Sequence, residues 1–308
     1  MTLAFVFPGQ GSQSIGMLAE LAEKFPIIEK TFSEASDVLG YDLWQLVQNG
    51  SADDLNATDK TQPAMLASGV AIWRLWQEQG GEMPSVMAGH SLGEYTALVC
   101  SGALAFTSAI KLVEARGQFM QNAVAAGEGG MAAILGLEDD AVIALCEKYS
   151  EGEVLEAVNF NTPGQVVIAG AVNAVNRAVE NAVEAGAKKA VALPVSVPSH
   201  CALMKPAAEQ LEKMLNDIEI VSPSIPVINN VDVDQSESPS DIKDALVRQL
   251  YQPVQWVKTI NKILAGDVEK VIECGPGKVL AGLNKRIARR TPALPILDNA
   301  TLEKALSN

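Results

Sequence analysis

Residues 85–100 read SVMAGHSLGEYTALVC. The apolar run Ser85–Ala88 predicts a buried strand, and Glu94–Cys100 predicts a helix. Between them, Gly89-His90-Ser91-Leu92-Gly93 matches G-x-S-x-G, a sharp strand-to-helix turn that needs small residues two before and two after the serine. Such a turn holds Ser91 at a helix N-terminus, where free N–H groups and the helix dipole favour a developing oxyanion. The stretch predicts a serine nucleophile; the alternative is a tight turn whose glycines serve packing alone.

Other short apolar runs resemble the strand before this turn. Leu3–Phe7, Pro226–Asn229 and Lys270–Cys274 are predicted strands with helical segments between them. Strands that alternate with helices indicate an α/β fold with a parallel sheet.

The middle of the chain has a different order of elements, β-α-β-β-α-β, which is typical of a ferredoxin-like unit. The predicted elements, in order, are Met131–Leu135, Asp139–Tyr149, Val154–Val158, Gln165–Ala169, Val172–Ala185 and Lys189–Val195. We therefore expect a small inserted domain over residues 123–195. Residues 1–122 and 196–308 would together form the larger domain.

Composition excludes several classes of protein. The chain has 308 residues, 48% of them apolar and 19% charged, which is typical of a well-packed enzyme. A net charge of −14 argues against nucleic-acid binding. The first apolar run stops at Pro8, too short for a signal peptide or a membrane span. Four cysteines without a CxxC pair indicate a cytoplasmic protein, and two histidines outside any metal-ligand spacing argue against a metal site.

A serine nucleophile needs a general base within hydrogen-bonding reach. Only His90 and His200 carry an imidazole. Adjacent side chains diverge at a sharp turn, so His90 is badly placed beside Ser91, and His200 is the predicted base. An acid usually orients such an imidazole, but none stands out between residues 91 and 200. A backbone or amide carbonyl could serve instead.

One charged residue interrupts the apolar face of the helix predicted over Ala105–Asn122. Arg116 lies in the middle of a stripe formed by Ala109, Leu112, Val113, Phe119 and Met120. A buried guanidinium needs an anionic partner. Either an internal acid or the carboxylate of a substrate could supply it, and physical reasoning from the residues leaves both open.

Six short motifs in this order resemble those of a known family: Phe7–Gln13 (FPGQGSQ), Gln62–Ala64, Gly89–Glu94 (GHSLGE), Arg116–Gly117, Asn159–Asn161 and Gly275–Gly277. The chain resembles the malonyl-CoA:acyl carrier protein transacylases of bacterial type II fatty acid synthesis along nearly its whole length. The resemblance implies an α/β-hydrolase-like domain with a ferredoxin-like insert. It also implies malonyl transfer through a serine ester from malonyl-CoA to holo acyl carrier protein, with no cofactor.

The resemblance implies specific roles. Ser91 would be the nucleophile, His200 the base and the Gln249 main-chain carbonyl the group that orients the base. The N–H groups of Gln10 and Leu92 would form the oxyanion hole. Substrate binding would fall to Arg116, which would hold the malonyl carboxylate, and to Gln10, His90 and Gln62.

One position departs from the family pattern. Malonyl-selective relatives often carry an aromatic residue directly before the base, and this chain has Ser199 there. Steric exclusion of a branched methylmalonyl group is therefore not guaranteed.

Acyl carrier protein is itself acidic, so docking on a −14 enzyme needs a local basic patch. Five cations with no acid between them form the candidate, which we call the basic patch: Lys278, Lys285, Arg286, Arg289 and Arg290. The alternative is an ordinary solvated helix face. The chain is expected to act as a monomer.

Three other functions compete with this one. A serine esterase or thioesterase would use the same nucleophile and base, with water as the acceptor. A scaffolding protein that binds acyl carrier protein would have a vestigial site. A dinucleotide fingerprint at Gly9-Gln10-Gly11 fails because Ser14 stands where the third glycine is needed.

Overall fold

The computed structural model describes residues 2–195 and 197–307. Ser196, the predicted start of the second segment of the larger domain, lies outside the described residues, as do Met1 and Asn308.

The larger sheet is parallel and has the order β7-β2-β1-β8-β9. Its strands are β1 (Leu3–Phe7), β2 (Val86–Gly89), β7 (Val227–Ile228), β8 (Lys270–Glu273) and β9 (Ala293–Pro295). The prediction of a parallel sheet is confirmed. Strand β9 was not predicted, because three residues that end in a proline carry no readable periodicity.

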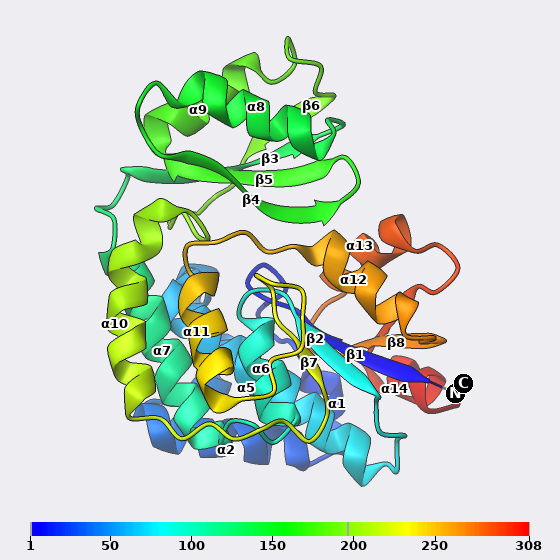
Figure 1. The fold of residues 1–308 in the computed structure, drawn as a ribbon. Coiled ribbons are helices and arrows are strands. Elements are labelled where there is room, and N and C mark those ends of the chain that lie inside the picture. Colours follow the sequence, from blue (N-terminus) through cyan, green and yellow to red (C-terminus); the bar gives the residue numbers. More distant parts are fainter. Residues whose placement is uncertain (1, 196, 308) are drawn as a thin grey trace.

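Helices cover both faces of this sheet (Figure 1). They are α1 (Ala19–Lys24), α2 (Ile27–Leu39), α3 (Leu43–Asn49), α4 (Ala52–Asn56), α5 (Thr58–Glu78), α6 (Gly93–Cys100), α7 (Phe106–Asn122), α10 (Lys205–Asn216), α11 (Pro239–Gln249), α12 (Trp256–Ala265), α13 (Val279–Ile287) and α14 (Asn299–Ser307), with a 3₁₀ turn at Ala202–Met204.

Strand β1 shows why helices are needed on both sides. Side chains alternate along a strand, so Phe5 and Phe7 enter a core cluster with α5, whereas Ala4 and Val6 enter a second cluster with α12. All five residues of the strand are buried. A strand that is apolar on both faces is stable only as the centre of a layered α/β domain.

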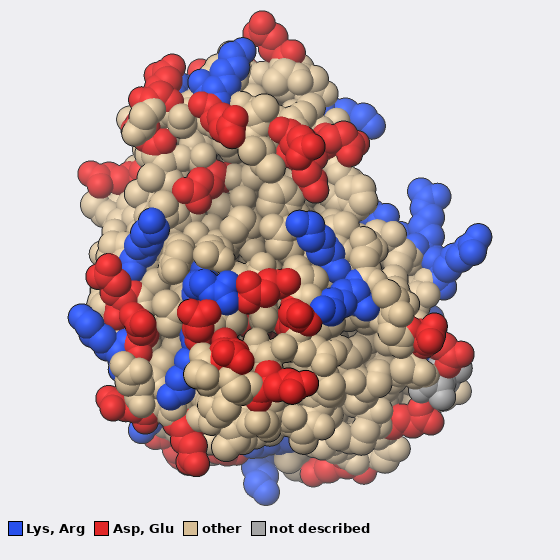
Figure 2. Space-filling view, viewed as in Figure 1, with Lys and Arg blue, Asp and Glu red and all other residues tan. Residues whose placement is uncertain are grey.

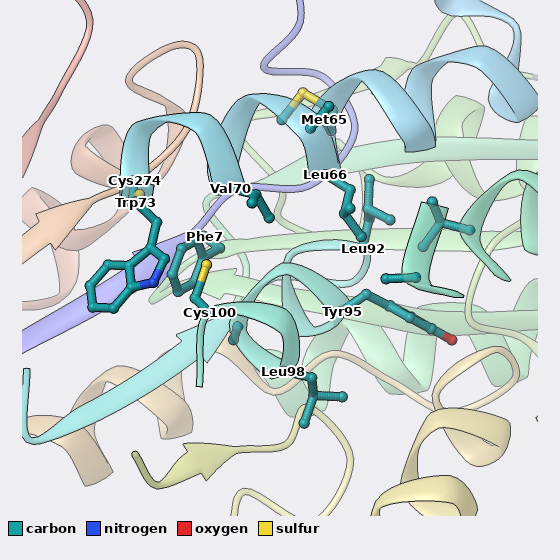
Figure 3. Packing of buried hydrophobic residues seen from close by; sticks show 14 of the residues in the cluster. Phe7, Met65, Leu66, Val70, Trp73, Leu92, Tyr95, Leu98, Cys100 and Cys274 are labelled. Carbon is teal, nitrogen blue, oxygen red and sulfur yellow. The ribbon is translucent and has the colours of Figure 1, made fainter. Parts of the chain in front are cut away.

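The first of these clusters surrounds the start of α6 (Figure 3). Leu92 and Tyr95 are buried there with Leu66 of α5. A Cβ on Gly69 would lie 2.6 Å from the Cγ2 atom of Thr96, so α5 and α6 pack at close range. This packing anchors the turn that carries Ser91.

The smaller sheet is antiparallel, with the order β4-β5-β3-β6, and lies apart from the parallel sheet (Figure 1). Its strands are β3 (Gly129–Leu135), β4 (Leu155–Thr162), β5 (Gln165–Ala171) and β6 (Lys189–Ala192). Helices α8 (Asp139–Ser150) and α9 (Val172–Asn181) pack on it around a separate core. The predicted β-α-β-β-α-β order is confirmed, whereas the domain boundaries at residues 122/123 and 195/196 stay predictions.

Strand β4 is longer than the sequence indicated. It was predicted to end at Val158 and continues to Thr162. The N–H of Phe160 donates to the Val254 carbonyl at 3.0 Å, and the N–H of Val254 donates to the Val158 carbonyl at 2.8 Å. This pairing with a distant segment extends the strand, and it ties the small sheet to the loop before α12. Strand β6, in contrast, ends at Ala192 instead of Val195.

Among the helices that the structure describes, none combines the length and the apolar character that crossing a bilayer requires.

Candidate active site

Ser91 occupies the turn between β2 and α6 in a left-handed backbone conformation, with φ of 52°. A Cβ on Gly89 would lie 1.8 Å from the carbonyl carbon of Gly93, and one on Gly93 would lie 2.0 Å from the Phe7 carbonyl oxygen. Only glycine fits at both positions. The predicted need for small residues on either side of the nucleophile therefore has a steric cause.

Asn230, which follows β7, holds this turn in place. Its Oδ1 accepts from the backbone N–H of Ser91 at 2.7 Å, and its Nδ2 donates to the Gly89 carbonyl at 2.6 Å. Sequence analysis missed this residue. The available signal was its position directly after a strand at the carboxyl edge of a parallel sheet, where functional side chains gather.

His200 lies against Ser91, as the sequence indicated. Its Nε2 is 2.9 Å from the Ser91 Oγ, and its Nδ1 is 2.6 Å from the Gln249 main-chain oxygen. A carbonyl can only accept, so Nδ1 carries the proton and Nε2 presents a lone pair to the serine hydroxyl. Burial, together with the positive charge of Arg116, lowers the pKa of His200 to about 3, so the imidazole is neutral near pH 7.

The His90 ring hydrogen-bonds Asn161 rather than the Ser91 hydroxyl. Its Nε2 lies 2.8 Å from the Oδ1 of Asn161, near the end of β4, and its ring lies 5.5 Å from the ring of Trp256. Burial lowers the pKa of His90. Because β4 extends to Thr162, Asn161 lies at the site. The sequence did not predict its contact with His90.

Arg116 is 1% exposed and is held by amide oxygens. Its Nη1 donates to the Gln62 Oε1 at 2.8 Å, and its Nη2 donates to the Gln249 Oε1 at 2.9 Å and to the Ser91 Oγ at 3.3 Å. No acidic oxygen of the described residues lies within 4.0 Å of it. An ion pair between Arg116 and an internal acid, the alternative that the sequence allowed, is therefore not formed among the described residues.

Glu94 is a second buried ionisable residue, which sequence analysis did not single out. Its Oε2 accepts from the Gln249 Nε2 at 2.8 Å and from the Asn230 N–H at 2.9 Å. Burial raises the pKa of Glu94 to about 7, although the hydrogen bonds from Gln249 and Asn230 and the nearby Arg116 oppose that rise. Because Glu94 belongs to the GHSLGE motif, the sequence placed it near the nucleophile. The sequence did not predict its hydrogen-bond partners.

The loop after β1 lies against the nucleophile turn. A Cβ on Gly9 would lie 2.5 Å from the His90 carbonyl oxygen. This close approach places Gln10, the next residue, near the start of α6, where Leu92 is the N-cap residue. The structure thus brings together the two segments that carry the predicted oxyanion-hole residues, Gln10 and Leu92.

All five cations of the basic patch are exposed. Leu280 and Leu283 are buried beneath α13, so the helix presents its cations outward. Arg286 also donates to the Gln165 Oε1 of β5 at 2.8 Å, which joins this helix to the small sheet. In Figure 2, blue side chains project at the right, over α13 and the loop after it.

Comparison with known proteins agrees with this geometry. The model of the acyl transferase domain family matches residues 4–294. The malonyl CoA-acyl carrier protein transacylase of Salmonella typhimurium is 58% identical over 304 residues, covering 99% of this chain and 98% of that protein. The Bacillus subtilis protein of the same name is 46% identical and covers 99% and 96%.

Two solved structures are similar throughout. An acyl carrier protein S-malonyltransferase from Vibrio cholerae superposes with a TM-score of 0.97 at 59% identity, covering 99% of each chain. A malonyl-transacylase in complex with a type II PKS acyl-carrier protein superposes with a TM-score of 0.99 at 56% identity, covering all of both chains. The chain therefore belongs to the malonyl CoA-acyl carrier protein transacylases, a branch of the acyl transferase family.

Proposed function

We propose that this chain moves a malonyl group from malonyl-CoA to the phosphopantetheine thiol of holo acyl carrier protein through an ester on Ser91. One observation carries the proposal: the Ser91 Oγ lies 2.9 Å from a neutral imidazole and 3.3 Å from a guanidinium that has no acidic partner among the described residues. A nucleophile, a base and an unclaimed cation suit an acyl donor that ends in a carboxylate.

His200 would handle the proton in both half-reactions. Its Nε2 takes the Ser91 proton as the Oγ attacks the thioester carbonyl carbon. The carbon–sulfur bond then breaks, and coenzyme A leaves as a thiol with that proton. In the second half-reaction the carrier thiol gives its proton to Nε2 and attacks the malonyl ester, and Ser91 recovers the proton. Each product leaves before the next substrate reacts, which is a ping-pong scheme.

The Gln249 main-chain carbonyl would keep the imidazole in the reactive tautomer through its 2.6 Å contact with Nδ1. The N–H groups of Leu92 and Gln10 would stabilise the oxyanion of each tetrahedral intermediate. The N–H of Ser91 is already engaged by Asn230, which leaves the next amide along the chain for this task.

Arg116 would hold the malonyl carboxylate. Gln62 and Gln249 fix its two Nη atoms with neutral oxygens, so the charge is oriented without being cancelled. A planar guanidinium suits a carboxylate in a bidentate geometry. We propose that Gln10, Gln62 and His90 line the same acyl site.

Intact mass measurement tests the chemistry. After incubation with malonyl-CoA alone, the wild-type chain should gain one malonyl group, whereas Ser91→Ala should not. Added holo acyl carrier protein should discharge the adduct. If no adduct forms and free malonate accumulates, water is the acceptor and the chain is a thioesterase.

The basic patch would dock acyl carrier protein beside the site, since α13 also touches the small sheet. Reversing Lys285 and Arg286 to Glu should raise the KM for the carrier and leave the KM for malonyl-CoA unchanged. The matched control reverses Lys30 of α2 and Lys213 of α10, which produces the same change in net charge far from α13 (Figure 1). Equal effects of the two pairs would show that net charge alone matters.

We also propose a monomer in the cytoplasm. The exposed large apolar side chains of the described residues are scattered over separate elements, which supports a chain without a large apolar interface: Ile15, Met83, Ile143, Val183, Val195, Val221 and Val279. The four cysteines are buried free thiols, which supports a reducing compartment. Light scattering after gel filtration tests the oligomeric state.

A further inference from the structure

Gln249 connects the two halves of the site. Its main-chain oxygen contacts the His200 Nδ1, and its side-chain Oε1 accepts from the Arg116 Nη2. The base and the guanidinium therefore depend on the position of one residue. A group that fixes the orientation of the Gln249 amide therefore also fixes the orientation of the Arg116 guanidinium.

The other end of that amide faces Glu94. The Gln249 Nε2 donates to the Glu94 Oε2 at 2.8 Å and to the Ser91 carbonyl at 3.1 Å. If the amide were turned over, its NH₂ would face the Arg116 guanidinium, donor against donor, and its oxygen would face two acceptors. Glu94 thus permits only one orientation of the amide.

Glu94 is itself held firmly. Its Oε2 also accepts from the Asn230 N–H at 2.9 Å, and Asn230 binds the nucleophile turn through its side chain. Glu94, Arg116, Asn230 and Gln249 are each at most 3% exposed, so water does not compete for these hydrogen bonds. A rigid chain of bonds runs from the nucleophile turn through Glu94 and Gln249 to Arg116.

We propose that Glu94 is a positioning residue for substrate selection: by accepting from the Gln249 Nε2, it aims the Gln249 Oε1 at Arg116 and holds the guanidinium ready for the malonyl carboxylate. This inference rests on the proposed role of Arg116. The function required of Glu94 is that of a hydrogen-bond acceptor. An amide oxygen in the same place can perform it, whereas an apolar side chain cannot.

Two variants separate these properties. Glu94→Gln keeps an oxygen that can accept both bonds, and Glu94→Met keeps the length of the side chain but accepts neither. The readout is kcat/KM for formation of the acyl-enzyme with malonyl-CoA, divided by that with acetyl-CoA. Glu94→Met should lower this ratio about tenfold, the usual effect of losing a hydrogen bond to a charged partner. Glu94→Gln should keep it within about twofold.

A double-mutant cycle tests the route through Gln249. In Gln249→Leu, which retains the main-chain carbonyl for His200, the further change Glu94→Met should alter the ratio by less than about twofold. A full tenfold effect in that background would overturn the proposal, because Glu94 would then act without the amide.

Glu273 provides the matched control. It is a second buried carboxylate whose pKa burial raises to about 7, and it accepts from the Leu280 and Ala281 N–H groups at the start of α13. Glu273→Met should leave the malonyl-to-acetyl ratio unchanged. An equal fall in this control, or an unchanged ratio in Glu94→Met, would overturn the proposal. A wild-type chain that forms no malonyl adduct would instead reject the proposed function.

Discussion

The Oδ1 of Asn230 accepts from the backbone N–H of Ser91 at 2.7 Å, and the Nδ2 of the same side chain donates to the Gly89 carbonyl at 2.6 Å. The two ends of one amide therefore clamp both sides of a turn whose serine has φ of 52°. A non-glycine residue in that conformation costs free energy, on the order of 1–3 kcal/mol, so the surrounding contacts must hold it.

Replacing the clamp should slow the nucleophile. Asn230→Ala should lower the rate of labelling of Ser91 by a fluorophosphonate about tenfold, and lower the free energy of unfolding by about 1–3 kcal/mol, because a buried N–H and a buried carbonyl lose their partners. Asn229→Ala is the control, since the Asn229 side chain bonds the loop at Asp232, Asp234 and Ser236. Equal labelling of both variants would show that the clamp does not position Ser91.

The pH dependence of labelling should reflect the lowered pKa of His200, about 3. Only the neutral imidazole accepts the Ser91 proton, so the rate should stay flat from pH 8 down to about pH 5 and fall only at lower pH. The charge of Arg116 lowers this pKa, so Arg116→Met should move the acidic limb to higher pH. An acidic limb near pH 6.5 that persists in Glu94→Gln, which removes the carboxyl with a pKa of about 7, would contradict the lowered pKa of His200.

Removing the guanidinium should abolish selection for the carboxylate. Arg116→Met should lower kcat/KM for malonyl-CoA acylation by roughly 100-fold, with a much smaller effect on acetyl-CoA, since a buried charge–carboxylate pair is worth about 2–5 kcal/mol. Arg74→Met is the control, because Arg74 lies on α5 and pairs with Glu34 at 2.7 Å, outside the site. A retained preference for malonyl-CoA in Arg116→Met would reject the proposed role of Arg116 in binding the carboxylate.

Two glycines should respond in opposite directions to the same change. Gly93→Ala should severely destabilise the fold, because its Cβ would lie 2.0 Å from the Phe7 carbonyl oxygen in a closely packed region. Gly282→Ala, on the exposed face of α13 with no atom outside its own stretch of helix within 4 Å of its Cβ, should gain about 0.5–1 kcal/mol. Thermal unfolding measures both. A stable Gly93→Ala variant would mean that β1 and α6 can move apart.

Ser91, His200 and Arg116 each had a local or compositional signal in the sequence, whereas Gln249 was named only through the family resemblance. Ser91 lay in a strand-turn-helix pattern, and His200 was one of only two histidines. Arg116 interrupted an apolar stripe, and the stripe is buried as predicted apart from Phe119, which is half-buried. Strand β9 and the second half of β4 lacked such a signal, because pairing with distant segments stabilises them.

Sequence alone was sufficient for the alternation of strands and helices, the inserted β-α-β-β-α-β unit and the nucleophile turn, because periodicity and turn sterics act between near neighbours. Tertiary structure alone showed that Asn230 and Glu94 join the site, and which hydrogen bonds connect them to Gln249. Asn230 lies 136 residues from Glu94 along the chain, and Gln249 lies 155 residues from it, yet all three share hydrogen bonds. Such contacts arise because parallel strands end at one edge of the sheet and bring their following loops together, and no local pattern encodes which loops will meet.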